Sequence, residues 1–152
     1  MSMAESTQYP YSLNFSIGSI VLMIILMLLL LSNVIGANTV LIWAVFGFCA
    51  LISLFLLTIL IAKRLIPALK GDIALALDDE GINDYIRDIS IEWKDIEKIE
   101  LIRSRSASIM RIDLKWESDY GKQIAISLRW VKGKDAEIYD TVMAYFEQDD
   151  QQ

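Results

Sequence analysis

The sequence predicts a membrane-spanning helical hairpin followed by a small β-rich α+β domain. Residues 6–62 contain no charged side chain, and all 14 basic residues lie at or after Lys63. Two apolar runs, each long enough to cross a bilayer, lie within the uncharged stretch. From residue 73 onward apolar side chains recur at every second position, and from residue 135 at a helical period. The chain therefore has two chemically different parts.

The hairpin is predicted from two apolar runs, residues 15–35 and 40–62. As helices they cover the ~30 Å hydrocarbon core at ~1.5 Å per residue. Only a short uncharged link, residues 32–39, separates them, so the two helices must run antiparallel. A cleaved signal peptide is the alternative, but the first twelve residues lack Lys and Arg and a second span follows at once.

The orientation of the hairpin is predicted from its flanking charges. Lys63, Arg64 and Lys70 directly follow the second span, whereas the connecting link carries no charge. Basic residues favour the cytoplasmic side, so we expect the C-terminal domain in the cytoplasm and the N-terminus beside it. The same three membrane-proximal residues are candidates for contact with anionic lipid.

The predicted organisation has five segments. Residues 1–12 form an N-terminal tail, residues 13–64 the transmembrane hairpin, residues 65–72 a linker that contains Pro67 and Gly71, residues 73–148 the cytoplasmic domain, and residues 149–152 a second tail.

The cytoplasmic domain begins with a short apolar strand, Ile73–Leu77. A tight turn over residues 78–81, in which Gly81 supplies a positive φ, returns the chain as a strand over residues 82–86. Alternating apolar positions then predict further strands, with a hairpin turn at residues 118–121. These positions are Ile89, Ile91, Trp93, Ile96, Ile99, Leu101, Met110, Ile112, Leu114, Trp116, Ile124, Ile126, Leu128 and Trp130. We expect an antiparallel meander with one buried face, on which the three tryptophans pack in the core.

Residues 135–148 are predicted to form an amphipathic helix. Ile138, Val142 and Phe146 recur at the spacing of one helical face. Asp135 and Glu137 lie near its start, where the helix dipole favours negative charge.

The order of these elements resembles the bacterial pleckstrin-homology-like (PH-like) domains that follow a two-helix membrane hairpin. The resemblance is carried by Asp-Glu-Gly-Ile at residues 79–82 and Ile-Ser-Ile-Glu-Trp-Lys-Asp-Ile-Glu-Lys-Ile at residues 89–99. It implies an antiparallel sheet or partial barrel closed by the C-terminal helix, and a multi-pass protein of the inner membrane with both termini cytoplasmic. It implies no particular activity.

Composition narrows the function classes. The chain has no His and a single Cys49, and it lacks a glycine-rich phosphate loop, so we expect no enzyme activity and no cofactor. The acidic run at residues 78–80 lacks the spaced ligands of a calcium loop, which favours a turn over a metal site. From Lys63 onward the net charge is −5, because 19 of the 20 acidic residues follow it. This balance speaks against nucleic-acid binding.

One candidate binding site remains in the domain. Arg103, Arg105 and Arg111 flank a loop of small residues, 104–108. Guanidinium groups bind phosphates and carboxylates bidentately, so the loop is a candidate contact for an anion or a partner. The alternative is an ordinary solvated hairpin.

The functional hypothesis is a membrane-anchored, non-enzymatic interaction module. It would present the PH-like domain at the cytoplasmic face to a protein partner or a second copy of itself. The alternative is an immunity or accessory protein that neutralises a membrane-acting toxin through the hairpin. A transporter subunit is disfavoured because neither span carries an ionisable residue.

Overall fold

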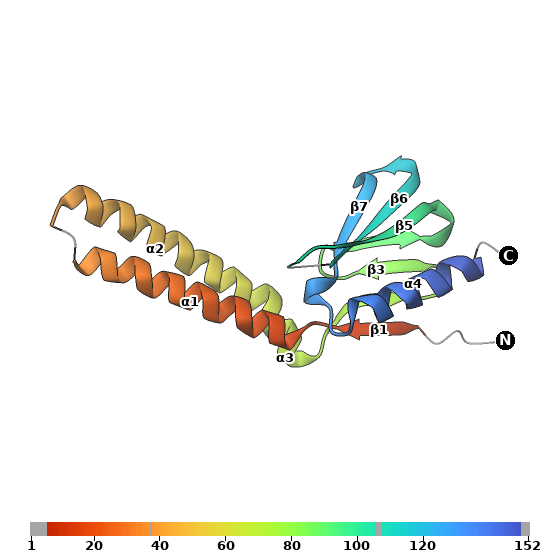
Figure 1. Cartoon of the computed structure of the whole chain (residues 1–152), viewed down its shortest axis with the longest axis horizontal. Coiled ribbons are helices and arrows are strands. Elements are labelled where there is room, and N and C mark those ends of the chain that lie inside the picture. Colours follow the sequence, from red (N-terminus) through yellow and green to blue (C-terminus); the bar gives the residue numbers. More distant parts are fainter. Residues whose placement is uncertain (1–5, 37, 106–107, 150–152) are drawn as a thin grey trace. The chain divides into compact units, whose positions relative to one another are not determined.

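The computed structural model describes residues 6–36, 38–105 and 108–149. The chain divides into two compact units, shown as ribbons in Figure 1. The helical unit is Leu13–Lys70. The sheet unit combines Met1–Ser12 with Gly71–Gln152, so it is built from chain on both sides of the helices.

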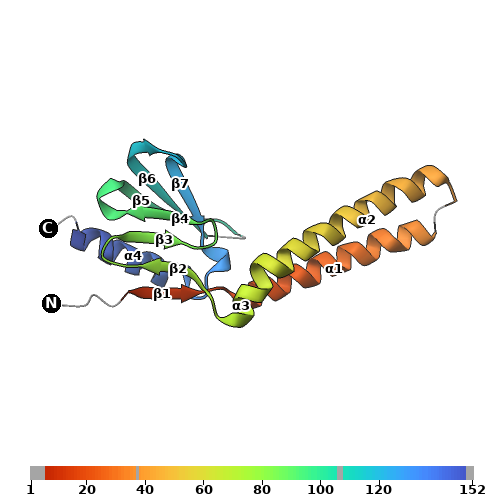
Figure 2. The ribbon, with the colours of Figure 1, turned by 180° about the vertical axis from the view of Figure 1, so that it is seen from behind.

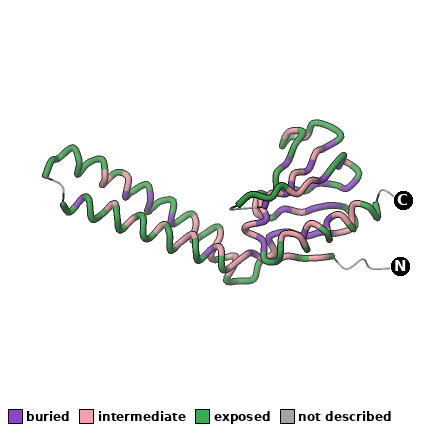
Figure 3. The backbone as a smooth tube through the Cα atoms, viewed as in Figure 1, coloured by how far each residue is buried: buried purple, intermediate pink, exposed green. Residues whose placement is uncertain are grey.

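The helical unit is a pair of antiparallel helices, α1 (Leu13–Ile35) and α2 (Val40–Leu60). Both are long and apolar enough to cross a membrane. Most positions of both helices are exposed and few are buried (Figure 3). Large apolar side chains are among the exposed ones, while small residues such as Ser16, Ala50 and Ser53 are buried. A water-soluble helix pair would bury its leucines, whereas helices in lipid approach each other through small residues. The exposure pattern therefore fits a lipid-facing hairpin.

The second helix continues beyond the predicted span. A π-helical turn, η1 (Ile61–Leu65), leads into α3 (Ile66–Lys70), so most of the predicted linker 65–72 is helical. Pro67 was expected to interrupt the chain here, but the wider π turn precedes it. In a regular α-helix the proline ring would clash with the carbonyl four residues earlier, and a π turn relieves that clash. The helix ends before Gly71, which has a φ of 73°.

The described residues of the sheet unit form seven strands in two antiparallel sheets. The first sheet has the order β1 (Thr7–Pro10), β2 (Ile73–Leu77), β3 (Gly81–Asp84), β4 (Ile89–Glu92). The second has the order β5 (Ile96–Arg103), β6 (Ser108–Ser118), β7 (Gly121–Ser127). Short 3₁₀ turns, η2 (Trp93–Asp95) and η3 (Leu128–Trp130), follow β4 and β7. The β-rich domain with a C-terminal helix is confirmed, but the sheets do not close into a barrel.

The predicted N-terminal tail contributes a strand. β1 pairs antiparallel with β2, with Thr7 opposite Leu77 and Tyr9 opposite Leu75. Figure 2 shows β1, β2 and β3 side by side. No pattern in the sequence predicted this pairing, because the four residues of β1 are too few to show a periodicity.

Helix α4 (Asp135–Asp149) connects the two sheets. Its Ile138 and Val142 are fully buried, as their spacing predicted. Tyr145 forms a hydrogen bond with Thr7 of β1 (3.0 Å) and stacks on Trp93, with ring centroids 5.9 Å apart. Tyr139 Oη donates to the Ile99 carbonyl of β5 (3.3 Å). The helix thus fixes the first sheet against the second.

Two tryptophans depart from the predicted core positions. Trp93 is 2% exposed and its indole nitrogen donates to the Asp78 carbonyl (2.8 Å). Trp116 is 70% exposed instead of buried, because the β6–β7 register shifts between Asp113 and Ser118. Trp130 is half-buried in η3, since β7 ends at Ser127 rather than continuing to it. Only one of the three is a core residue.

Candidate functional site

The sheet unit has one end from which both connections to the helices leave, at Ser12 and Gly71. We call it the connection end. The Tyr11 amide donates to the Asp72 carbonyl (3.2 Å) and the Ser12 amide to the Trp130 carbonyl (2.7 Å). The Lys132 amide donates to the Pro10 carbonyl (2.8 Å). These bonds hold the segment after β7 directly beside both connections.

Strand directions bring two loops to the same end. β2 starts at the connection end, so the antiparallel β3 finishes there, and the Tyr85 amide donates to the Ala74 carbonyl (3.0 Å). The turn over residues 85–88 therefore lies at this end. β7 also finishes there, and its partner β6 starts beside it, with Ile109 opposite Ser127. The loop between β5 and β6 is thus a part of the connection end.

Two of the three predicted arginines lie at the connection end. Arg103 ends β5 and Arg105 follows in the loop, and both side chains are exposed. Neither forms an ion pair with any residue that the structure describes, and the same holds for the exposed Lys132. Residues 106 and 107 of the predicted loop lie outside the described part of the chain.

The third arginine belongs to a different arrangement. Arg111 stands opposite Glu100 in the β5–β6 register and forms an ion pair and hydrogen bond with it. Its Nε lies 3.9 Å from a carboxylate oxygen of Asp113. Arg111 is therefore occupied within the sheet and does not join the loop arginines, which corrects the predicted three-arginine site. Sequence spacing could not show this, because the pairing depends on cross-strand register.

Glu100 is the centre of this charge network. Lys98 forms an ion pair and hydrogen bond with it on the same strand, and Arg111 approaches from β6. These partners hold the pKa of the Glu100 carboxyl below its usual value, with the Lys98 hydrogen bond as the largest cause. The same contact raises the pKa of Lys98. The network is a cross-strand clamp, because Glu100 contacts Lys98 on its own strand and Arg111 on β6.

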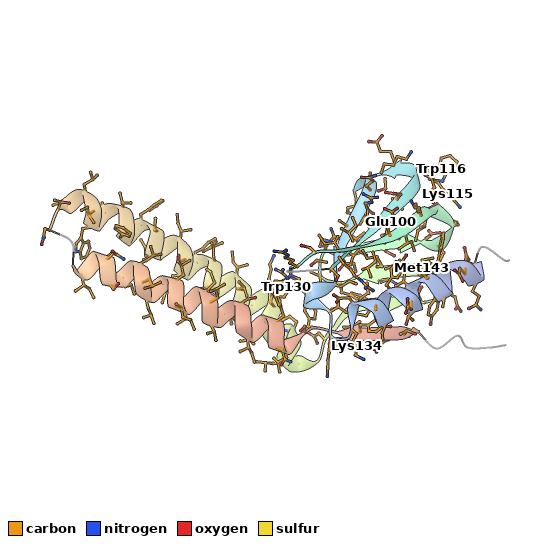
Figure 4. The ribbon with its side chains drawn as sticks, viewed as in Figure 1. Glu100, Lys115, Trp116, Trp130, Lys134 and Met143 are labelled. Carbon is orange, nitrogen blue, oxygen red and sulfur yellow. The ribbon has the colours of Figure 1, made fainter. Side chains whose placement is uncertain are left out.

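Apolar and aromatic side chains accompany the exposed charges of the connection end. Tyr85 is 55% exposed and Ile102 is 43% exposed. Trp130 is half-buried at the same end, whereas Trp116 lies at the opposite end of β6 and β7 (Figure 4). Sequence reasoning missed Tyr85, Ile102 and Lys132 because they come from three separate parts of the chain: a turn, the end of β5 and the segment after η3. The only signal in the sequence that could have found this surface was a tyrosine close to an arginine between two predicted strands.

The membrane-proximal basic residues predicted from sequence lie on the helical unit. Lys63 and Arg64 are in the π turn η1, and Lys70 is the last residue of α3. Lys63 and Lys70 are exposed and Arg64 is half-buried. All three therefore lie at the end of the helical unit from which the chain returns to the sheet unit.

The acidic turn at residues 78–80 is a structural feature. One Asp78 carboxylate oxygen accepts hydrogen bonds from the amides of Glu80 (3.0 Å) and Gly81 (2.9 Å), and the other accepts from the Asn83 side chain (2.9 Å). The carboxylate is thus used within the turn, in the manner of Asx turns. Among the described residues no group of acidic, His or Cys side chains is arranged to hold a metal ion.

A second exposed surface lies at the far end, where the strands run away from the connections. The β6–β7 hairpin carries Trp116, 70% exposed, and Tyr120, 54% exposed. Ser118 shapes its turn, because its hydroxyl donates to the Gly121 carbonyl (2.9 Å) and accepts from the Tyr120 amide (3.2 Å). Two aromatic side chains are therefore presented on a defined hairpin.

Comparison with known proteins gives no relative for this chain: no family model, curated protein or solved structure matches it. The resemblance to PH-like domains therefore stays a prediction.

Proposed function

We propose that this chain is a membrane-anchored, non-enzymatic interaction module. Its hairpin crosses the inner membrane, and its sheet unit, as a PH-like domain, faces the cytoplasm and binds a protein partner. The observation that carries the proposal is the pairing of β1 with β2. The chain leaves the folded unit, forms two apolar helices, and returns to the same unit.

This topology fits a membrane anchor better than a soluble fold. Two spans return the chain to the side on which it started, which the β1–β2 pairing requires. Exposed residues such as Leu22 and Phe55 line the outside of the helices, and water would strongly disfavour so much apolar surface. The basic residues at the end of the second helix favour the cytoplasmic side for the sheet unit.

The β6–β7 hairpin is the proposed surface for the protein partner. Trp and Tyr are enriched among the residues that contribute most to protein–protein affinity. Trp116 and Tyr120 lie at the far end of the sheet unit, away from the connections to the helices. The surrounding Lys115, Glu117 and Asp119 are charged, as in the polar rim of an interface.

Affinity purification of the full chain from native membranes tests the proposal. We expect a specific protein to co-purify with the wild type and to be lost from the Trp116→Ala/Tyr120→Ala variant. The Glu117→Ala/Asp119→Ala variant changes the same hairpin and should retain the partner. Recovery of no protein by the wild type, together with a monomer in detergent, would contradict the proposal.

A further inference from the structure

The charges of the sheet unit are unevenly distributed between its two ends. The far end carries the acidic turn of residues 78–80 and, on the β6–β7 hairpin, Glu117 and Asp119 together with Lys115 and Lys122, so its acidic residues outnumber its basic ones. The connection end carries the exposed Arg103, Arg105 and Lys132. A unit that is acidic overall thus presents, where it joins the helices, basic side chains that form no ion pair with any described residue.

The other charges of the connection end are mostly compensated. Arg87 pairs with the buried Asp84 (3.0 Å), and Lys134 pairs with Glu137 (3.0 Å). Asp72 and Asp88 are exposed and reduce the net positive charge of this end. Attraction to an anion therefore depends on Arg103, Arg105 and Lys132 rather than on the net charge of the connection end.

We propose that the connection end binds the anionic headgroups of the membrane in which the chain is anchored. Arg103, Arg105 and Lys132 contact lipid phosphates, while Tyr85 and Ile102 enter the interfacial layer. This inference rests on the proposed membrane anchoring. It assigns a lipid-binding surface to the sheet unit, separate from the partner surface on the β6–β7 hairpin.

The short connections bring this surface to the bilayer. Only Tyr11 and Ser12 separate β1 from α1, and only Gly71 and Asp72 separate α3 from β2. Two intervening residues leave three Cα–Cα steps of ~3.8 Å, so the ends of strand and helix lie at most about 11 Å apart. This limit is close to the Debye length of ~8–10 Å at 0.1–0.15 M salt, over which headgroup charge acts. Chain connectivity therefore limits how far the connection end can lie from the ends of the helices while β1 stays paired.

The side chains match the chemistry of that surface. Guanidinium groups bind phosphate oxygens bidentately, and Arg103 and Arg105 have no competing ion pair among the described residues. Tyr places its ring in the apolar boundary and its hydroxyl in water, which favours the membrane interface. An anionic bilayer offers both groups a partner at the same depth.

Site-specific fluorescence on the full chain tests the proposal. In a Cys49→Ala background, the Ile102→Cys variant carries an environment-sensitive fluorophore and is reconstituted in nanodiscs. We expect its emission to shift to shorter wavelength when anionic phosphatidylglycerol is added to phosphatidylcholine. A probe on the Tyr120→Cys variant, at the far end, should emit equally in both lipids.

Charge-reversal variants identify the residues that cause the emission shift at position 102. Arg103→Glu/Arg105→Glu should abolish the shift at position 102, whereas Lys115→Glu/Lys122→Glu, with the same charge change at the far end, should preserve it. High salt should reduce the shift, because it shortens the Debye length. Arg103→Gln/Arg105→Gln, which removes charge without adding repulsion, should reduce the shift and guards against misfolding of the first variant.

The outcomes separate this inference from the proposed function. Release of the chain from membranes by alkaline carbonate would contradict the anchoring itself. Stable insertion with identical emission in neutral and anionic nanodiscs would overturn the lipid-binding surface alone. A shift produced in neutral nanodiscs by inorganic phosphate would also overturn it, since the ligand would then be a soluble anion.

Discussion

Gly81 illustrates a residue whose role depends on a neighbouring strand. A Cβ atom at this position would lie 1.9 Å from the Ile91 carbonyl oxygen of β4. Gly81 does not have the positive φ that the turn predicted, so that expectation was wrong. The glycine is required by the close approach of β3 and β4 rather than by the turn.

The Gly81→Ala substitution should therefore destabilise the sheet unit. The added methyl group meets backbone that cannot rotate away, and overpacking of this kind costs about 1–3 kcal/mol. For a unit of this size we expect the Tm to fall by roughly 4–8 °C per kcal/mol. Thermal unfolding of the full chain in detergent, followed by near-UV circular dichroism, measures the change.

The control for this substitution is Ser90→Ala, on the exposed face of β4. Ser90 donates a hydrogen bond to Asn83 (2.7 Å) but is itself exposed, so the loss of its hydroxyl should have little effect. Equal unfolding temperatures for Gly81→Ala and the wild type would show that β3 and β4 are not as close as described.

The ion pairs of Glu100 make the stability of the sheet unit depend on pH. Its pKa is lower in the folded state than in the unfolded chain, where it is about 4.3. Its contribution to stability is therefore fully present above pH ~4.3 and is lost as the pH falls through the lowered folded pKa. We expect the Tm difference between wild type and Glu100→Gln to be largest near neutral pH and to shrink in acid.

Thermal unfolding at a series of pH values tests this expectation. Glu117→Gln, on the exposed β6–β7 hairpin, controls for the removal of one carboxylate. A Tm difference for Glu100→Gln that stays constant from neutral to acidic pH would contradict the role of its ion pairs.

At the scale of elements, strand β1 is the decisive feature. Four residues before the helices pair with a strand that begins after them, and α4 adds a hydrogen bond from Tyr145 to Thr7. β1 also shields one edge of β2, which would otherwise be open to pairing with other chains.

Disulfide trapping tests the β1–β2 register. In a Cys49→Ala background, the Gln8→Cys/Ala76→Cys variant places cysteines at paired positions, whose Cα atoms in such ladders are about 4.5–5.5 Å apart. We expect rapid disulfide formation under mild oxidation, measured by loss of reactive thiols. In the control, Gln8→Cys/Ala74→Cys, the partner lies two residues further along β2, about 7 Å away along the strand, and is out of reach. Equal disulfide formation in both variants would indicate that the N-terminal segment is not paired with β2 in this register.

At the scale of the whole molecule, the β1–β2 pairing constrains topology. If the helical unit spans a membrane as proposed, both of its ends lie on the same side, and the turn between α1 and α2 lies on the other. Thr39 is in this turn and Tyr120 is in the sheet unit.

Cysteine labelling in cells tests this arrangement. In a Cys49→Ala background, a membrane-impermeant maleimide should label the Thr39→Cys variant in intact cells. It should label the Tyr120→Cys variant only after permeabilisation, because the basic residues after α2 favour a cytoplasmic sheet unit. Labelling of both variants in intact cells would exclude the proposed orientation.

The sequence by itself determined the two apolar helices, the strands β2 to β7 and the helix α4. Each of these elements is indicated by the spacing of apolar residues within its own segment. That spacing can be read without knowing which distant residues the segment contacts. Ile138 and Val142, for example, are buried as their spacing indicated.

Only the tertiary structure decided which distant residues meet. It paired β1 with β2 across the hairpin, placed Arg111 against Glu100, and exposed Trp116 through a register shift. It also brought Tyr85, Arg103 and Lys132 to one end of the sheet unit from three separate parts of the chain. The physical reason is that strand pairing and register are set by contacts between residues far apart in the chain, and no local period records them.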